Sequence, residues 1–507
     1  MMSFIKRRQY DMKKYLGAVL AAVLAAALLC GCEIIPVPQK TPETEPPVES
    51  VAMVVTSEDL AGFAEQYPAL RQADLRGSTC YADIESYKAS HPEVSVLYTV
   101  FLGGTEVLPD VTSLTLTPED FDFALLETNL QYLHSLKELR FPETTLTLEQ
   151  IDALRQANPG IDIDYTVSLC GIPCEGAAED LDLSGIEPSV LLDQAQKLSL
   201  FPQLQDIYLM DAEGNTRYTL EDAAALQAQV PQVLLHYSFQ LFGKTVSTED
   251  SEIIFKGQQL AKKEGALDTL RMALSILRGC DRFVLDNCGF SNETMAALRD
   301  EFRDTTKVVW RIWFGEGGCL TDLKVIRHVY GLYDYNSANL IYCEDAEYVD
   351  FGHNEILKQC DFVAGMPHLK AIILSGSMIS DLTPFQNCKE LEFLEIAYCG
   401  YVTDLTPLAS CTNLKRLNIA YTKAESLAAL DALELEVLVD ARSKVGTEEW
   451  GRFEALHPDC IVQHTGDAKD DFPYGYPWRY EQNGDPNPYY ALLKEKFGYP
   501  NPTNTIY

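Results

Sequence analysis

The chain has 507 residues, of which 47% are hydrophobic and 23% are charged, and its formal net charge is −35. This apolar fraction is typical of a packed globular protein and excludes a disordered or fibrous class. The 75 acidic residues outnumber the 40 basic ones and would repel phosphate backbones, so we expect no nucleic acid among its partners. A chain of this length predicts several domains unless a repeat extends one of them.

Residues 1–31 predict an export signal. Five basic residues precede an apolar run over residues 16–29, which ends in Leu29-Cys30-Gly31-Cys32. At about 1.5 Å per residue, this run is too short to cross a hydrocarbon core of about 30 Å. The pattern therefore favours a secretion signal over a membrane span.

The end of this run resembles the lipobox of bacterial lipoproteins, in which small residues precede a cysteine that becomes acylated. The resemblance implies cleavage before Cys32, acyl chains such as palmitate on it, and anchoring on the outer side of a bacterial cell membrane. An ordinary signal peptide cut near Ala27 is the alternative. Residues 32–50 contain prolines at positions 36, 38, 42, 46 and 47, which predicts a semi-extended tether.

A long, irregular repeat occupies residues 51–340. Its copies begin near Tyr67, His134 and Phe201, and each continues into a helix-like amphipathic stretch such as residues 148–157. Each helix-like stretch is followed by an X-Pro pair and a strand, and the pairs are His91-Pro92, Asn158-Pro159 and Val230-Pro231. A fourth copy from Cys280 lacks the proline, and a degenerate fifth ends at His457-Pro458. This order predicts parallel strands joined by helical crossovers.

A shorter repeat of 21–23 residues occupies residues 341–466. Segments of the form L-x-x-L-x-L start at Leu369, Leu391, Leu414 and Leu435, and DLTP follows at Asp381 and Asp404. The leucines of such a segment point inward from a short strand. Because one coil cannot bury its own apolar side, neighbouring coils must stack and share a core.

These segments resemble the leucine-rich repeat family, and the DLTP element is similar to the short repeats of bacterial internalin-type surface proteins. The resemblance implies an α/β fold: a leucine-rich repeat solenoid with a curved parallel sheet and a helical or irregular convex side. The position that closes each strand is usually Asn or Cys in this family. Here it holds Asn354, Ser377, Cys399 and Thr422, so we expect a weaker polar ladder in the same fold.

The resemblance also implies a binding site for a protein or glycan on the concave strand face. Carrying the pattern over residue by residue gives nine outward positions, which are Tyr348, Asp350, His353, Phe393, Glu395, Tyr398, Arg416, Asn418 and Tyr421. Aromatic and arginine side chains are common anchors of interfaces. Tyr398 and Tyr421 are expected to stack on adjacent coils, with mere coverage of the strand as the alternative.

The sequence contains no HExxH helix, GxSxG elbow or phosphate loop, so we predict no catalytic residues, no enzyme activity and no cofactor. Cys170 and Cys174 lie four apart, but no second pair follows, so we predict no metal site. Cys388 and Cys411 occupy equivalent places in adjacent coils. We expect both to be buried thiols, with a disulfide as the alternative.

Residues 467–507 are rich in tyrosine and proline, with a short helix expected over residues 490–497. We expect this tail to cap the exposed last coil, and an aromatic segment that contacts a ligand or the cell wall is the alternative. The sequence as a whole favours a non-enzymatic, lipid-anchored surface protein that binds a protein or glycan. The alternative is an envelope lipoprotein enzyme, or an enzyme accessory, that acts on cell-wall or extracellular polymers.

Overall fold

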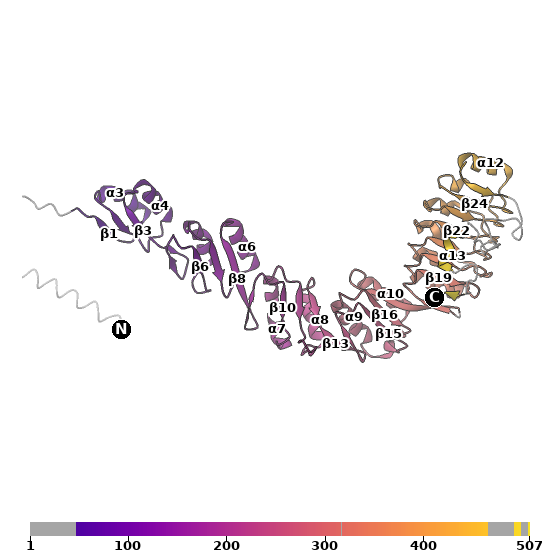
Figure 1. The fold of residues 1–507 in the computed structure, drawn as a ribbon, viewed down its shortest axis with the longest axis horizontal. Helices are drawn as coiled ribbons and strands as arrows, with labels where there is room; N and C mark the ends of the chain where they lie inside the picture. Colours follow the sequence, from indigo (N-terminus) through magenta and orange to yellow (C-terminus); the bar gives the residue numbers. More distant parts are fainter. Residues whose placement is uncertain (1–46, 316, 465–490, 498–504, 507) are drawn as a thin grey trace, which may run out of the picture. The chain divides into compact units, whose positions relative to one another are not determined.

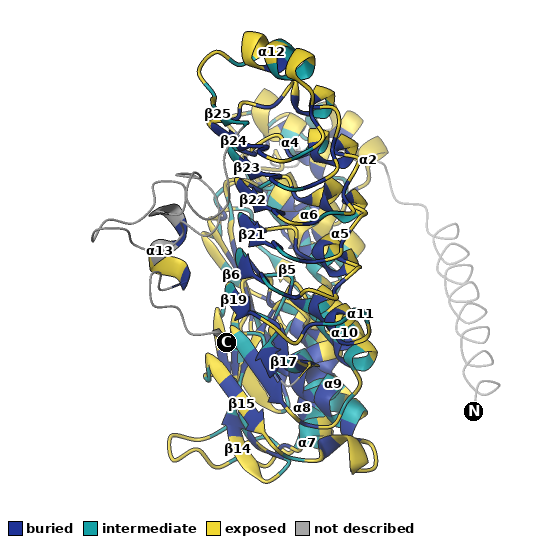
Figure 2. Cartoon of the chain, turned by 90° about the vertical axis from the view of Figure 1, so that its right-hand side faces the viewer, coloured by how far each residue is buried: buried dark blue, intermediate teal, exposed yellow. Residues whose placement is uncertain are grey.

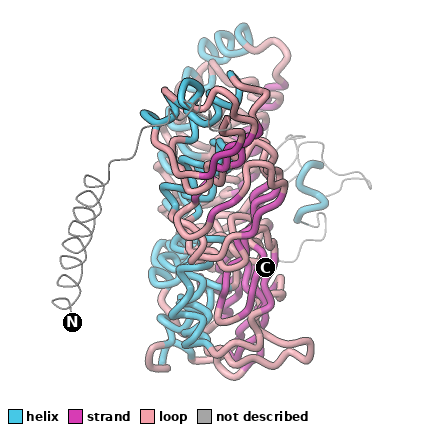
Figure 3. Tube along the Cα trace, turned by 90° about the vertical axis from the view of Figure 1, so that its left-hand side faces the viewer, coloured by secondary structure: helices cyan, strands magenta, loops and turns pink. Residues whose placement is uncertain are grey.

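The computed structural model describes residues 47–315, 317–464, 491–497 and 505–506. The chain divides into two compact units, the first with residues 1–113 and 119–137 and the second with residues 114–118 and 138–507. Within each unit the strands line one side, and helices and turns line the other (Figure 1 and Figure 3).

The first unit contains one parallel three-stranded sheet and one short hairpin. The sheet has the order β1 (Ser50–Ala52), β2 (Gln72–Asp74), β3 (Ser95–Leu97), and the hairpin pairs β4 (Val100–Phe101) with β5 (Glu106–Val107). The helices of this unit are α2 (Ser57–Ala61), α3 (Phe63–Gln66), α4 (Tyr81–Ser90) and α5 (Phe123–Asn129), with a 3₁₀ turn η1 (Leu130–Tyr132).

The second unit begins with the long repeats, whose strands form separate small sheets. The first sheet is β6 (Ser113–Thr115), β7 (Glu138–Phe141), β8 (Asp162–Leu169) and β9 (Ile172–Glu175). The next is β10 (Asp180–Asp182), β11 (Asp206–Tyr208) and β12 (Leu234–His236), followed by the hairpin of β13 (Ser238–Leu241) and β14 (Lys244–Ser247). The last is β15 (Glu252–Lys256), β16 (Arg282–Asp286), β17 (Lys307–Phe314) and β18 (Gly317–Leu320).

Helices and 3₁₀ turns connect the strands of these long repeats. They are α6 (Leu148–Ala157), α7 (Pro188–Gln194), η2 (Ala195–Leu200), α8 (Leu220–Gln229), η3 (Leu260–Lys262), α9 (Ala266–Ile276) and α10 (Asn292–Glu301). The stretch predicted as helical, residues 148–157, coincides with α6. The parallel pairing of β7 with β8 and of β11 with β12 confirms the helical crossovers.

The X-Pro pairs mark where the helices of the long repeats end. Asn158 follows α6 with φ −128° and ψ 64°, outside the helical region. The same backbone recurs at His91, Val230 and His457, each of which also precedes a proline. Steric conflict with the proline ring disfavours the helical conformation at the preceding residue, which explains these helix ends.

The short repeats form one continuous eight-stranded sheet. Its order is β25 (Ile461–Gln463), β24 (Val437–Val439), β23 (Arg416–Asn418), β22 (Phe393–Glu395), β21 (Ala371–Ile373), β20 (Tyr348–Asp350), β19 (Val325–His328) and β26 (Thr505–Ile506). Strands β19 to β25 are parallel neighbours, and β26 pairs with β19 in the antiparallel sense. Figure 2 shows β21 to β25 side by side in chain order along the sheet.

The connections in the short repeats are mostly single 3₁₀ turns. They are α11 (Asp334–Ser337), η4 (Ala338–Tyr342), η5 (Asp361–Gly365), η6 (Thr383–Asn387), η7 (Thr406–Ser410), η8 (Ala428–Leu430) and α12 (Thr447–Leu456), and α13 (Ala491–Phe497) follows later in the chain. The two DLTP segments lead into η6 and η7, with a proline in the first turn of each.

A row of fully buried side chains runs along this sheet and forms its core. The middle residues of successive strands lie in register, and they are Val349, Ile372, Leu394, Leu417 and Leu438. The first leucine of each L-x-x-L-x-L segment from Leu369 to Leu414 is buried as well. The predicted leucine-rich repeat solenoid is thus confirmed. The continuous sheet starts at β19, before residue 341, and the long repeats carry their sheets separately.

The residues that close the strands differ in how they join coils. The buried Asn354 side chain accepts from Leu332 N at 2.9 Å and donates to His328 O at 3.0 Å and Phe351 O at 2.8 Å. Thr422 donates only to Ile419 O, within its own coil. Asn354 therefore ties two coils together, whereas Thr422 does not.

We predict that Asn354→Ala destabilises the short-repeat sheet more than Thr422→Val. Alanine removes the acceptor of the buried Leu332 N–H and the bond that joins the two coils at His328 O, at a cost of about 1–3 kcal/mol for a buried unsatisfied group. Thr422→Val removes one local bond and should cost about 1 kcal/mol. Thermal unfolding of the two variants measures the difference, and equal losses would contradict the role given to Asn354.

Candidate recognition surface

The first and third residues of each short-repeat strand lie on the face opposite to the buried middle row. The nine predicted contact residues lie on this outward face or directly after it. Asp350, Phe393, Glu395 and Asn418 are buried, Tyr348, His353, Arg416 and Tyr421 are half-buried, and Tyr398 is exposed. The predicted strand face is therefore correct, but accessibility differs from expectation at the four buried positions. Contact with a partner stays a prediction.

The three buried polar residues on the outward face have structural partners. Asp350 receives Arg327 Nε at 3.0 Å and both side chains are buried, so the charges pair away from water. Glu395 accepts from Ser375 Oγ at 2.6 Å. Asn418 accepts from the backbone N–H of Ala420 at 3.1 Å. Buried polar groups require such partners, and these side chains fix the turns after the strands.

The buried apolar residue, Phe393, lies beneath the C-terminal helix. Leu493 and Phe497 of α13 pack into one cluster with Phe393 and other outward residues of the sheet. Leu493 and Phe497 are 0% and 1% exposed. Figure 2 shows α13 beside the stacked strands. In its described part the tail thus lies on the sheet face, and β26 pairs with β19 at the opposite end of the sheet from β25, whereas we expected the tail to cover the exposed last coil.

An aromatic edge follows the ends of the short-repeat strands. We define it as the four residues Tyr330, His353, Tyr398 and Tyr421, which have φ of 74°, 60°, 62° and 61°. The rings of Tyr398 and Tyr421 stack with centroids 4.3 Å apart and planes 10° apart, as predicted. Tyr330 and His353 form a second stacked pair at 5.5 Å. Tyr330 and Tyr398 are 56% and 40% exposed.

Bonds between coils hold this edge in its left-handed conformation. The backbone N–H of Tyr398 donates to Ala420 O at 2.8 Å, and that of Tyr421 donates to Ala441 O at 3.0 Å. The equivalent places in two other coils hold Gly376, with φ 78°, and Arg442, with φ 59°. Positive φ is uncommon for bulky residues. Its recurrence at four aromatic positions, and at Gly376 and Arg442, therefore shows a backbone conformation imposed by the coil.

A second group of charged and aromatic residues lies on the long repeats and was missed by sequence reasoning. His236 Nε2 lies 2.7 Å from Asp206 Oδ1, Nδ1 contacts Glu249, and the ring stacks on Tyr208 at 4.3 Å. Partial burial opposes protonation of the ring, but the two carboxylates outweigh it and raise the pKa of His236. The alternation of inward and outward residues in β11 and β12 could have indicated this group from the sequence, since Tyr208 and His236 occupy paired positions on the two strands.

An exposed tryptophan lies in the last long repeat. Trp313 is 52% exposed, and the guanidinium of Arg311 lies 5.8 Å from its ring centroid. Arg311 Nε donates to the buried carboxylate of Asp286. Arg311 and Trp313 line a cleft of about 390 Å³. Asp286 lies at the end of β16, between the lining residues Leu285 and Asn287. This site offers an aromatic face beside a fixed cation.

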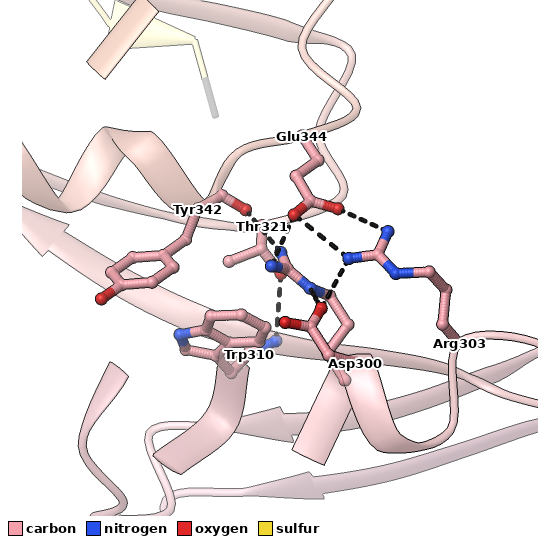
Figure 4. Close-up of polar contacts among 7 residues, drawn as sticks. Asp300, Arg303, Trp310, Thr321, Tyr342 and Glu344 are labelled. Carbon is pink, nitrogen blue, oxygen red and sulfur yellow. Dashed lines mark hydrogen bonds and ion pairs between the residues drawn. The ribbon is translucent and has the colours of Figure 1, made fainter. Parts of the chain in front are cut away.

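The helical side of the same repeat carries a salt-bridge network (Figure 4). Arg303 donates to Glu344 Oε2 at 2.9 Å and to Asp300 Oδ1 at 2.6 Å. These carboxylates raise the pKa of Arg303. Arg299 pairs with Glu344 and lies 5.3 Å from the Trp310 ring centroid. Because each guanidinium is matched by a carboxylate, the network joins α10 to η4 and is not a binding site for anions.

The cysteines of the described residues are thiols. Burial raises the pKa of Cys388 to about 12 and that of Cys411 to about 11. Both side chains lie in the core, as expected, and no disulfide joins them in this part of the chain. Among the described residues there is also no group of three or more His, Cys, Asp or Glu suited to a metal ion, so Cys170 and Cys174 belong to no such group there.

Cys32 lies outside the described residues, so its lipidation stays a prediction. Within the part of the chain that the structure describes, none of the helices combines the length and the apolar character needed to cross a membrane.

Comparison with known proteins gave matches among solved structures. No family model and no curated protein sequence matches the chain. An internalin from Listeria monocytogenes, inlF, aligns with 15% identity over 72% of this chain and 86% of its own, with a TM-score of 0.24. A leucine-rich repeat protein from Leptospira interrogans aligns with 15% identity over 78% and 91%, with a TM-score of 0.25. Similarity at this level carries no information on what this chain binds.

We predict a pH-dependent contribution of His236 to stability. Its pKa is raised in the folded protein, so the stabilisation is fully present below the unfolded value of about 6.5 and is lost as pH rises through the folded value. His236→Gln should therefore lower the thermal midpoint more at pH 6 than at pH 9. His368→Gln, which changes an exposed histidine, is the control, and an equal effect of His236→Gln at both pH values would contradict the prediction.

Proposed function

We propose that this chain is a non-enzymatic recognition protein, anchored by lipid on Cys32 to the outer side of a bacterial membrane, and that it binds a protein or glycan partner. The aromatic edge is the observation that supports this proposal most directly. The rings of Tyr398 and Tyr421 stack at equivalent positions of adjacent coils, and those of Tyr330 and His353 do the same, so aromatic rings are gathered along this edge.

The aromatic edge has the properties of a binding platform. Its rings are amphipathic, and the stacked pair of Tyr398 and Tyr421 needs little further ordering on association, since the coil already fixes the backbone. Aromatic side chains dominate the binding energy of protein interfaces. The flat ring faces also suit the apolar C–H faces of sugars, which is why both partner classes remain in the proposal.

The Trp313 cleft extends the proposed recognition surface along the same unit. Trp313 is exposed and Arg311 is fixed by Asp286, so this site presents an aromatic face beside a guanidinium whose charge a carboxylate already matches. Aromatic side chains are frequent at binding hot spots. No arrangement among the described residues favours the alternative enzyme function specifically. A hydrolysis screen on cell-wall and extracellular polymers tests that alternative directly.

We predict that Tyr398→Ala combined with Tyr421→Ala weakens capture of the partner by about 30-fold, because loss of an anchor worth about 2 kcal/mol has that effect. The assay immobilises the protein and measures capture from bacterial envelope fractions and host surface extracts, followed by titration of the captured partner. Tyr401→Ala is the matched control, since Tyr401 is an exposed tyrosine outside the aromatic edge. Unchanged affinity of the double variant would exclude this edge as the site.

We predict that Cys32→Ser abolishes acylation and releases the chain from the membrane. Each buried acyl CH₂ contributes about 0.8 kcal/mol, so loss of the acyl chains removes the anchor. Mass spectrometry of the N-terminal peptide and fractionation of cells measure the result. Cys30→Ser should leave both unchanged, and equal behaviour of the two variants would contradict lipidation at Cys32.

A further inference from the structure

The outward face of the short-repeat sheet carries an apolar strip. We define it as Ala371, Ile373, Phe393, Ala397, Ala420, Val437, Val439 and Ala441, which are all buried. Soluble proteins rarely leave a contiguous patch of this kind in water. In the long repeats the outward positions are mixed: Asp162, Asp164, Asp180 and Asp182 are exposed, and so are the apolar Leu97, Leu234 and Ile254. The buried apolar strip lies on the coils that α13 covers.

The described C-terminal residues occupy this strip at two places. Leu493 and Phe497 lie four apart on α13, hence on one helix face, and both are buried in the strip. Glu495 and Lys496 are exposed, and Lys496 Nζ lies 5.3 Å from the Tyr348 ring centroid. Beyond the helix, β26 adds two residues to the edge of β19. We call α13 and β26 together the C-terminal strap.

We infer that the C-terminal strap is an intramolecular competitor for the apolar strip. While it is docked, it covers Phe393 and limits access to the half-buried Tyr348 and Tyr421, three of the predicted contact residues. A partner that uses this face must displace it. This inference rests on the proposed recognition function and adds regulation to it.

The strap also indicates what kind of partner the strip fits. Its anchors are two large apolar side chains one helical turn apart, with charged residues on the other helix face. Helix recognition in grooves commonly uses this pattern of anchors. The strip therefore suits an amphipathic helix that presents Leu-like and Phe-like residues at positions i and i+4.

The test uses the full chain with a protease recognition sequence inserted after Gly484, cleaved after folding. After cleavage, we expect the strap fragment to stay associated with the solenoid on size-exclusion chromatography at micromolar concentration. An excess of fluorescein-labelled synthetic peptide of residues 485–507 is then added to replace the cleaved fragment. We expect the intact chain to bind this peptide at least tenfold more weakly than the cleaved and washed protein.

Two variants of the labelled peptide provide the matched comparison. Leu493→Asp with Phe497→Asp, introduced into the labelled peptide, should weaken its binding to the cleaved protein at least tenfold. Glu495→Gln, on the exposed side of the same helix, should change it less than twofold. Because these variants lie in the peptide, folding of the solenoid does not affect their interpretation.

Three results would overturn the inference. The first is equal peptide binding by intact and cleaved protein, and the second is equal binding of the two variant peptides. The third is unchanged partner capture after removal of the strap, because a strap that competes with the partner must weaken capture while it is docked. Absence of any captured partner would instead count against the proposed function, and the peptide exchange would still report on the strap.

Discussion

Backbone hydrogen bonds between successive coils are the constraint on which the short-repeat part of this protein depends. Each of the strands β19 to β25 has only three or four residues and gains its stability from its neighbours in the stack. The same bonding continues past the strand end, where Tyr398 and Tyr421 donate to the next coil. The register between coils is thereby set, and with it the rows in which equivalent side chains lie.

Because the register between coils fixes these rows, the side chains along one row determine whether that face of the sheet is polar or apolar. The inward rows are apolar throughout, as a shared core requires. The outward rows differ between the two kinds of repeat: carboxylates such as Asp180 and Asp182 remain exposed, whereas Ile373 and Phe393 are buried beneath the C-terminal helix. One solenoid therefore carries a polar surface and an apolar one, and the apolar one has an occupant within the same chain.

Local features of this structure could be predicted from the sequence, whereas contacts between residues far apart in the sequence could not. The helix ends at Asn158 and Val230 follow from the prolines that come next, and the buried row follows from the leucine spacing. The burial of Phe393 depends on α13, about a hundred residues later. Asp350 is neutralised by Arg327 from the preceding coil, and its repeat pattern alone does not show that pairing.

The antiparallel pairing of β26 with β19 bears on the solubility of the protein. A parallel sheet of stacked coils ends in an edge strand whose N–H and C=O groups can pair with any other extended chain. Here Thr505 and Ile506 satisfy part of that edge beside His328 and Arg327. Departure of the last residues would bare an apolar face and an unpaired edge together, the combination that favours assembly of copies edge to edge. Retention of the C-terminus would in that case keep the protein monomeric as well as govern access to the sheet.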